Sequence, residues 1–296
     1  MEPVGAKGEG PLDRLLLILE NIRFAHTIFA LPFCLMAFAY ASYPRPNLSD
    51  LLLVLLAMVF ARTAAMSYNR YVDADVDARN PRTRNRPIPS GRLSRRAVLA
   101  WTVGSSALFI IVAGLINLWA LCLSPVALLI VLSYSHAKRF TSLSHLWLGL
   151  SLGVAPLGGW IAADQLPWSP VPWLISAAVL FWVAGFDIIY ATQDEAFDRQ
   201  AGLHSLVTRL GLVGALRLSK ALHAASVVCL VALGLVAPLL GPVYYMGVGV
   251  AAACLLYEQN LVRPGDLSQV NVAFNSMNGI VGIVLCIATI TDIYWW

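Results

Sequence analysis

The stretch from residue 50 to residue 77, DLLLVLLAMVFARTAAMSYNRYVDADVD, joins a long apolar run to an acidic end. Residues 50–68 consist mostly of Leu, Val, Ala, Met and Phe, and the run matches the ~20 apolar residues that an α-helix needs to cross a bilayer. The carboxylates of Asp73, Asp75 and Asp77 follow soon after it. The pattern predicts a membrane-spanning helix with charged chemistry at one end.

The composition of the whole chain supports a membrane location. Of the 296 residues, 59% are hydrophobic and 12% are charged, about half the ~25% charged share of a soluble domain. The mean hydropathy is +0.73. The five cysteines all lie in apolar runs, which excludes a disulfide scaffold, and the net charge of +4 is too small to favour nucleic acid as a partner. The composition therefore predicts a multi-pass protein embedded in the lipid bilayer.

Further apolar segments predict an all-α fold with nine transmembrane helices around a central cavity and a cytoplasmic cap region. The segments cover residues 24–42, 50–68, 98–117, 118–137, 146–163, 172–192, 217–239, 242–259 and 270–292. We expect a single domain, 1–296, in which two related four-helix halves, about 24–137 and 146–259, precede the ninth helix. A short amphipathic helix is expected over Leu15–Ile22 in the membrane interface, and the polar first fourteen residues predict no cleaved signal peptide.

The basic residues predict the orientation in the membrane. With nine spans, the N-terminus and the loops after the second, fourth, sixth and eighth spans share one side. One of these loops carries seven arginines: Arg79, Arg82, Arg84, Arg86, Arg92, Arg95 and Arg96. Arg45 is the exception on the opposite side. Because Lys and Arg concentrate in cytoplasmic loops, we expect a cell-membrane protein with a cytoplasmic N-terminus and an external C-terminus.

Two groups of acidic residues lie at matching positions four predicted spans apart. The second span closes on Asn69, Asp73 and Asp77, and the sixth closes on Asp187, Asp194 and Asp198, with Tyr190 alongside. Residues four apart share one face of a helix, so each group is predicted to form one row. By the span count, both rows reach the cytoplasmic face.

The two rows point to phosphate chemistry. Carboxylates four residues apart repel one another, and partial burial raises the cost. They could be solvated helix ends balanced by arginines, but the duplicated placement favours a functional site. One or two carboxylates per ion suit Mg²⁺ that is shared with a phosphate substrate. The arginine-rich loop, Lys138 and Arg139 would then neutralise that phosphate.

Several motifs together resemble the UbiA superfamily of intramembrane prenyltransferases. The first aspartate-rich motif of that family is matched by Asn69-x3-Asp73-x3-Asp77 with RTRNRPIPSG at residues 82–91, the second by Asp187-x2-Tyr190-Ala191-x2-Asp194-x3-Asp198, and the segment after the fourth span by Tyr134-Ser135-x2-Lys138-Arg139. The likeness covers essentially the whole chain. It implies an enzyme that binds a polyprenyl diphosphate through Mg²⁺, with Asn69, Asp73, Asp77, Asp194 and Asp198 as the metal and diphosphate residues.

The reaction implied by the resemblance agrees with these residue types. Ionisation of an allylic diphosphate needs electrostatic stabilisation of the leaving group, which Mg²⁺, Lys138 and nearby arginines would supply. A dry apolar cavity would protect the carbocation until it attacks a small aromatic acceptor. The candidate groups near that acceptor are Asp187 and Tyr190. Further candidates for binding the diphosphate are Arg62, Arg79, Arg139 and Arg199.

The acceptor has several candidates. We expect 4-hydroxybenzoate, in quinone biosynthesis, because it is common among such chains. The stretch Arg23–Phe29 departs from the Arg-x2-Lys-Pro-x-Gly pattern of 4-hydroxybenzoate-prenylating members. It resembles a subgroup that includes futalosine-route menaquinone enzymes, whose acceptor would be 1,4-dihydroxy-6-naphthoate; geranylgeranylglyceryl phosphate is a further alternative. A cation-coupled secondary transporter is the alternative from another class, but transporter sites lie near mid-membrane, whereas these acids lie at one edge.

Overall fold

A computed structural model describes residue 17 and residues 29–295 of the chain. Almost all of the predicted amphipathic helix, Leu15–Ile22, and the start of the first predicted span lie outside these residues. The described part is nearly all helical and contains no β-strand; a single isolated bridge joins Arg263 to Asp266. The predicted all-α class is therefore confirmed.

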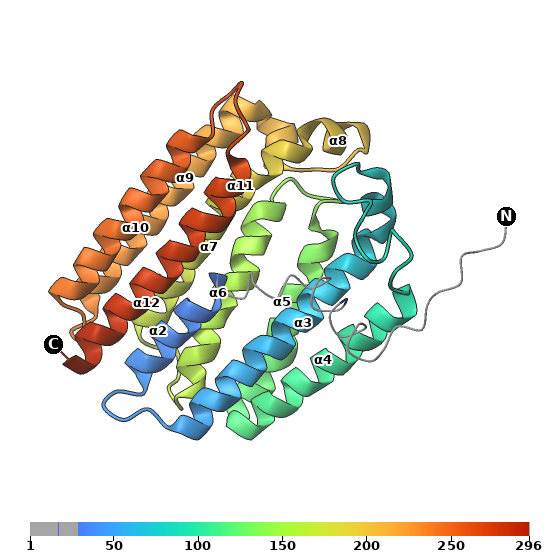
Figure 1. Ribbon diagram of the computed structural model, residues 1–296. Helices are drawn as coiled ribbons and strands as arrows, with labels where there is room; N and C mark the ends of the chain where they lie inside the picture. Colours follow the sequence, from blue (N-terminus) through green and yellow to red (C-terminus); the bar gives the residue numbers. More distant parts are fainter. Residues whose placement is uncertain (1–16, 18–28, 296) are drawn as a thin grey trace.

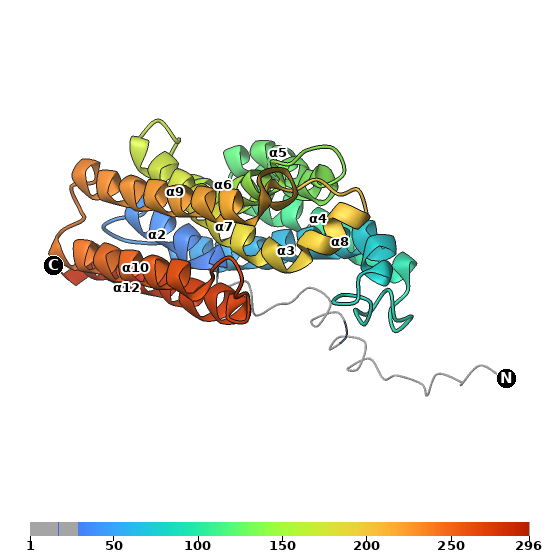
Figure 2. The same cartoon turned by 90° about the horizontal axis from the view of Figure 1, so that it is seen from above.

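The helices lie side by side along a common direction (Figures 1 and 2). In chain order they are α2 (Leu31–Ala41), α3 (Leu48–Arg79), α4 (Arg95–Ile116), α5 (Leu118–Ala137), α6 (Ser144–Ala162), α7 (Pro170–Ala191), the 3₁₀ helix η2 (Thr192–Asp194), α8 (Glu195–Gln200), α9 (Leu206–Val236), α10 (Pro242–Leu261), α11 (Val270–Val272), the π-helix η3 (Ala273–Met277) and α12 (Asn278–Trp295).

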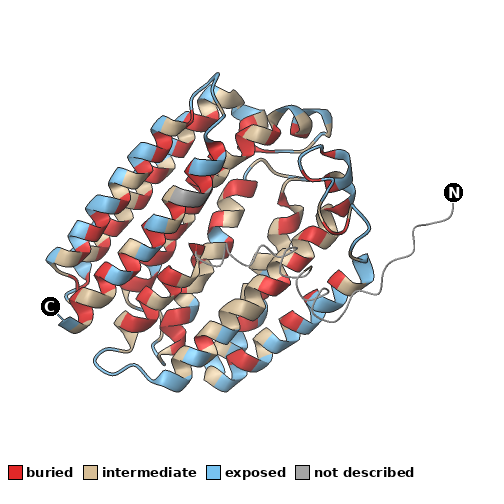
Figure 3. Ribbon diagram, viewed as in Figure 1, coloured by how far each residue is buried: buried red, intermediate tan, exposed pale blue. Residues whose placement is uncertain are grey.

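Seven of the described helical segments are long and apolar enough to cross a membrane. They are α3, α4, α5, α6, α7 with its extension to Gln200, α9 and α12. The apolar helix α2, with 11 residues, is shorter, and α10 lies outside this set. Large apolar side chains such as Leu118, Leu129 and Met246 are exposed. Exposed residues lie along the outside of the bundle (Figure 3), where lipid can cover apolar side chains. The protein is thus a multi-pass membrane protein, while the count of nine spans stays a prediction, as does the division into two related halves.

Several helix starts carry the polar side chains that cap free backbone N–H groups. The side chain of Asn47 accepts a hydrogen bond from the Ser49 amide at the start of α3, and Ser94 does the same for Ala97 in α4. Ser205 and Thr208 form a reciprocal capping box at the start of α9. These caps explain where α3 and α9 begin, ahead of the apolar runs predicted for them, while α3 also continues past its apolar run to Arg79.

The most deeply buried helix is α7, which packs between α6 and α9. Its Trp182 and Phe186 belong to the main hydrophobic core, together with residues of α2, α9, α10 and α12. Glycines of α6 allow the close approach: a Cβ at Gly149 would lie 2.3 Å from the carbonyl oxygen of Leu180. The close packing fixes α7 firmly, and α7 positions one wall of the site.

The polar connections gather at one end of the bundle (Figure 1). At this end lie the loop between α3 and α4, the link between α5 and α6, helix α8 and the turn between α10 and α11. The C-terminal end of α12 lies at the opposite end. This arrangement brings together the loops that the sequence assigns to one face of the membrane.

Candidate active site

A cavity of about 240 Å³ opens at the end where these connections gather. Its walls come from α3, the loop after it, α5, α6, α7, η2 and α8, with Phe274 of η3 on one side. The predicted site residues that line it are Arg62, Asn69, Asp73, Asp77, Lys138, Arg139, Asp187, Tyr190, Asp194 and Asp198. Residues far apart in the sequence therefore meet at one place, as the pairing of the two acidic groups requires.

One wall of the cavity is formed by successive turns of α3. Asn69, Asp73 and Asp77 all face the cavity from this helix. The side-chain amide of Asn69 donates a hydrogen bond to Asp73 Oδ2 at 2.9 Å. Asp77 is buried, and both of its oxygens accept from Arg86 Nη1 at 2.7 Å.

The opposite wall is not one helical row, contrary to the expectation. Helix α7 ends at Ala191 and the chain tightens into η2, so that Asp187 lies on α7, Asp194 on η2 and Asp198 on α8. The hydroxyl of Thr192 donates to the carbonyl oxygen of Ile189 at 2.7 Å, a local bond that competes with regular helix geometry. Asp194 and Asp198 still reach the cavity, but from separate short elements.

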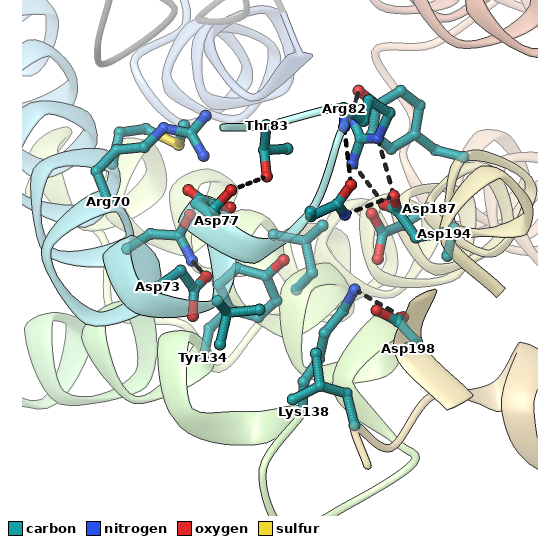
Figure 4. Close-up of a pocket in the computed structure, with 18 of the residues that line it drawn as sticks. Arg70, Asp73, Asp77, Arg82, Thr83, Tyr134, Lys138, Asp187, Asp194 and Asp198 are labelled. Atoms are coloured by element: carbon teal, nitrogen blue, oxygen red, sulfur yellow. Dashed lines mark hydrogen bonds and ion pairs between the residues drawn. The ribbon is translucent and has the colours of Figure 1, made fainter. Parts of the chain in front are cut away.

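Cations from two connecting segments, the loop after α3 and the link after α5, pair with these acids (Figure 4). Arg82 forms two hydrogen bonds with Asp194, Nε to Oδ1 at 2.9 Å and Nη2 to Oδ2 at 2.5 Å. Its Nη1 also donates to the hydroxyl of Tyr190 at 2.9 Å. Lys138 Nζ lies 3.6 Å from Asp198 Oδ2, and Arg139 Nη2 lies 3.9 Å from Asp73 Oδ1.

The electrostatics keep the two central cations charged. Burial works against the charge on Arg82, but the hydrogen bonds to Asp194 and Tyr190 together with the charges of these two groups outweigh it and raise the pKa of the guanidinium. Burial also opposes the charge on Lys138, while the carboxylate of Asp198, followed by those of Asp187 and Asp194, raises the pKa of its ammonium. The cavity thus holds charged cationic side chains paired with acids.

The oxygen donors suit Mg²⁺ only if a ligand completes its coordination. Among the described residues, no three His, Cys, Asp or Glu side chains come together as a metal-binding group. Each wall instead offers one or two carboxylates, which is how proteins hold Mg²⁺ that also binds substrate phosphates. Asp198 Oδ2 is buried without a hydrogen-bond partner, so it has a lone pair available for such an ion. The donor set therefore fits a metal shared with a phosphate.

The structure does not bring all the predicted residues to the cavity. Arg79 is exposed and does not line it. Arg199 also lies outside, where its Nη2 pairs with Glu195 at 3.0 Å along α8. Both were selected because they are charged neighbours of an acidic motif, and neighbours in sequence can point to opposite sides of a helix.

Other cavity residues were not selected as site residues from the sequence. They are Arg70, Asn80, Arg82, Thr83, Arg86 and Tyr134. The sequence assigns the arginine-rich loop as a whole to the phosphate, and the structure shows that Arg82 and Arg86 are the two of its arginines that line the cavity. Asn80, whose amide donates to Asp194 Oδ1 at 3.1 Å, gives no comparable signal in the sequence.

Deeper in the cavity the lining becomes apolar and aromatic. Leu148, Leu152 and Phe186 form this part together with Phe274, whose ring centroid lies 4.4 Å from that of Tyr190. Asp187 lies at the border between the charged and apolar parts, seven residues before Asp194. A charged pocket thus adjoins a region that excludes water.

Comparisons with known proteins agree with this arrangement. A model described as the UbiA prenyltransferase family matches residues 30–280. The 4-hydroxybenzoate octaprenyltransferase of Azoarcus sp. (strain BH72) is 31% identical over 242 residues, which cover 79% of this chain and 80% of the relative.

Two solved structures extend the comparison. The apo structure of a UbiA homologue from Aeropyrum pernix K1 is 40% identical, with a TM-score of 0.82, and covers 90% of this chain and 98% of its own. A UbiA homologue from Archaeoglobus fulgidus bound to GPP and Mg²⁺ shares the fold at 21% identity and a TM-score of 0.73, covering 94% of this chain and 99% of its own. The resemblance of the aspartate motifs is confirmed by the family match: the chain belongs to the UbiA prenyltransferase family and is a prenyltransferase.

Proposed function

We propose that the enzyme transfers a prenyl group from a polyprenyl diphosphate to 4-hydroxybenzoate in a Mg²⁺-dependent reaction of quinone biosynthesis. The observation that carries the proposal is the meeting of two acidic groups, on α3 and on η2 with α8, across one cavity that also holds Arg82, Arg86 and Lys138. The acceptor is supported by relatives such as the Azoarcus enzyme, which is named 4-hydroxybenzoate octaprenyltransferase.

The charged part of the cavity binds the diphosphate. Asn69, Asp73 and Asp77 on one wall and Asp194 and Asp198 on the other would hold Mg²⁺. When bound, Mg²⁺ neutralises the diphosphate and makes it a better leaving group. Arg82, Arg86 and Lys138, which pair with these acids in the structure, would be available to the diphosphate when the acids hold the metal.

The cationic side chains of the cavity would bind the leaving group. Lys138 and Arg82 keep their charge in the buried site because their pKa values are raised, so they can donate charge-assisted hydrogen bonds to the diphosphate oxygens. Arg86, Arg139 and the half-buried Arg62 line the same space. Fixed positive charge placed where negative charge develops lowers the barrier to breaking the C–O bond of the allylic diphosphate.

The apolar part of the cavity accommodates the reacting carbon and the acceptor. Phe186, Phe274, Leu148 and Leu152 exclude water, which would otherwise quench the carbocation. Asp187 and Tyr190 are the polar groups at this border and act near the acceptor. The prenyl chain is apolar, and a membrane-embedded enzyme can receive it from the lipid.

The alternatives use the site differently. An acceptor such as 1,4-dihydroxy-6-naphthoate or geranylgeranylglyceryl phosphate would leave the charged part unchanged and alter only the apolar part. A cation-coupled transporter would need no diphosphate. We further propose that the end of the bundle with the arginine-rich loop faces the cytoplasm, which places the N-terminus inside and the C-terminus outside.

The proposal is tested with purified protein, geranyl diphosphate, Mg²⁺ and 4-hydroxybenzoate, with a parallel reaction in EDTA. We expect prenylated 4-hydroxybenzoate only in the presence of the metal. Mg²⁺-dependent binding of geranyl diphosphate without product would reject this acceptor and direct the same assay to 1,4-dihydroxy-6-naphthoate. The absence of both geranyl diphosphate binding and product would contradict the proposal. Full activity in EDTA would contradict its metal dependence.

A further inference from the structure

A buried histidine contacts Asp187, one of the carboxylates that line the cavity. His145, in the first turn of α6, is 0% exposed, and its Nδ1 lies 2.6 Å from Asp187 Oδ2. An ionised carboxylate only accepts hydrogen bonds, so Nδ1–H of His145 is the donor. Among the described residues, no other hydrogen bond reaches the side chain of Asp187.

Burying the His145 imidazole has a free-energy cost. Burying an imidazole requires partners for both of its nitrogens, yet His145 Nε2 is buried without a hydrogen-bond partner. The bond does not cap a helix, because the start of α6 has no side-chain cap. The side-chain hydrogen bond that His145 makes therefore orients one oxygen of Asp187.

Asp187 also differs from the other carboxylates of the cavity. Asp77, Asp194 and Asp198 pair with Arg86, Arg82 and Lys138. The hydrogen-bond partner of Asp187 is instead an imidazole, and the Asp187 side chain, 15% exposed, lines the cavity together with Phe186 and Phe274. Asp187 lies on α7 itself, before the chain leaves that helix at Ala191, whereas Asp194 and Asp198 lie on η2 and α8.

We propose that Asp187 is the base that removes the ring proton of the acceptor, and that His145 is a positioning residue that aims its carboxylate. This inference rests on the proposed prenyl transfer. The ring carbon ortho to the hydroxyl forms a bond with C1 of the prenyl group as the bond between C1 and the diphosphate oxygen breaks. The same ring carbon then releases its proton to Asp187, and the C–H electron pair restores aromaticity.

The bond from His145 suits this role. With Oδ2 fixed by Nδ1–H, the carboxylate cannot rotate freely, and Oδ1 remains to accept the proton. The same hydrogen bond holds the carboxylate in place until the proton arrives.

The experiment compares wild type with His145→Leu, His145→Asn and Asp187→Asn. The Asn side chain can place an N–H donor near the position of Nδ1, whereas Leu cannot donate. A matched control is His223→Leu: His223 is also buried, bonds Gln259 at 2.9 Å, and does not line the cavity. Product formation, KM for geranyl diphosphate and the isotope effect with ring-deuterated 4-hydroxybenzoate are measured, with thermal unfolding in detergent alongside.

We expect His145→Leu and Asp187→Asn to lower kcat about 100-fold or more, which is typical for loss of a general base. KM for geranyl diphosphate stays unchanged, and an isotope effect appears because proton removal becomes slow. His145→Asn recovers most of the rate, and His223→Leu keeps the wild-type rate. If His145→Leu does not fold, the isotope effect in Asp187→Asn and the activity of His145→Asn carry the test.

Two results would overturn the inference. One is a rate loss in His145→Leu and Asp187→Asn without an isotope effect, and the other is a loss of geranyl diphosphate binding equal to the loss of turnover. If the wild type is active and His145→Leu and Asp187→Asn keep its rate, the inference is rejected but the proposed function is not. A wild type without any metal-dependent product would reject the proposed function, and this inference with it.

Discussion

Asn69, Asp73 and Asp77 lie on successive turns of one uninterrupted helix, α3, whereas the acids that face them are divided between η2 and α8. The first wall is fixed by the periodicity of a single helix. The second depends on where α7 ends and on contacts from elsewhere. Two similar sequence motifs thus produce similar chemistry, but the first motif depends on one helix alone, whereas the second also depends on tertiary contacts.

The loop after α3 connects the two walls. Arg86 turns back to Asp77, nine residues away, while Arg82 crosses the cavity to Asp194, 112 residues away. The same short segment therefore neutralises one acid locally and one at long range. If both walls hold one diphosphate, their residues must have comparable effects on activity in spite of this difference.

The largest expected effect comes from removing one acid from either wall. Asp73→Ala and Asp194→Ala should each lower prenyl transfer by about 10³-fold, because each removes part of the charge that stabilises the transition state. The rate is measured with geranyl diphosphate and Mg²⁺, after folding in detergent has been confirmed. The control is Asp75→Ala: Asp75 belongs to the first motif but is exposed and pairs with Arg95 outside the cavity. Near-wild-type turnover in either cavity variant would refute the metal assignment.

Arg82 is expected to have the next largest effect. Arg82→Ala should weaken geranyl diphosphate binding by about 10- to 100-fold, because it removes a bidentate, charge-assisted donor and leaves the Asn80 amide as the remaining hydrogen-bond donor to Asp194. Arg84→Ala is the matched control, since Arg84 is exposed in the same loop and does not line the cavity. Equal losses in both variants would mean that the loop acts through its net charge and that the crossing contact has no special role.

A smaller effect is expected for Lys138. Lys138→Ala should weaken diphosphate binding about 10-fold and leave acceptor KM unchanged, because the ammonium faces Asp198 in the charged part. Since nearby carboxylates raise its pKa, the lysine stays protonated well past neutrality, and affinity should not fall between about pH 7 and pH 9. Binding titrations at these two values check this; a drop in affinity on going to the higher pH would contradict it.

The smallest effect concerns the support of the second wall. Gly149→Ala places a methyl group against the Leu180 carbonyl oxygen and should destabilise the protein by about 1–3 kcal/mol. Gly158→Ala in the same helix meets nothing within 4 Å and serves as the control. Unfolding in detergent measures both. If the packing of α7 positions the second wall, Gly149→Ala lowers diphosphate affinity as well as stability. An unchanged affinity would show that the position of the second wall does not depend on this packing.

The sequence predicted the parts that depend on local periodicity. The row on α3 follows from residues four apart on a continuous helix, and the membrane location follows from the apolar runs. The break after Ala191 was not predictable in the same way, because no Gly or Pro marks it and the Thr192 side chain makes a bond that other residues could equally make. Neither the crossing of Arg82 to Asp194 nor the contact of His145 with Asp187, 42 residues apart, has any periodic signature.

The central claim is that both walls hold the same diphosphate, and a double-mutant cycle tests it most directly. Mg²⁺-dependent binding of a non-ionising thiolodiphosphate analogue of geranyl diphosphate is measured for wild type, Asp73→Asn, Asp194→Asn and the double variant. If the walls act together, the double variant binds no more weakly than either single variant, because either change already breaks the shared site. Losses of binding free energy that simply add would contradict the claim and assign the two walls to separate sites.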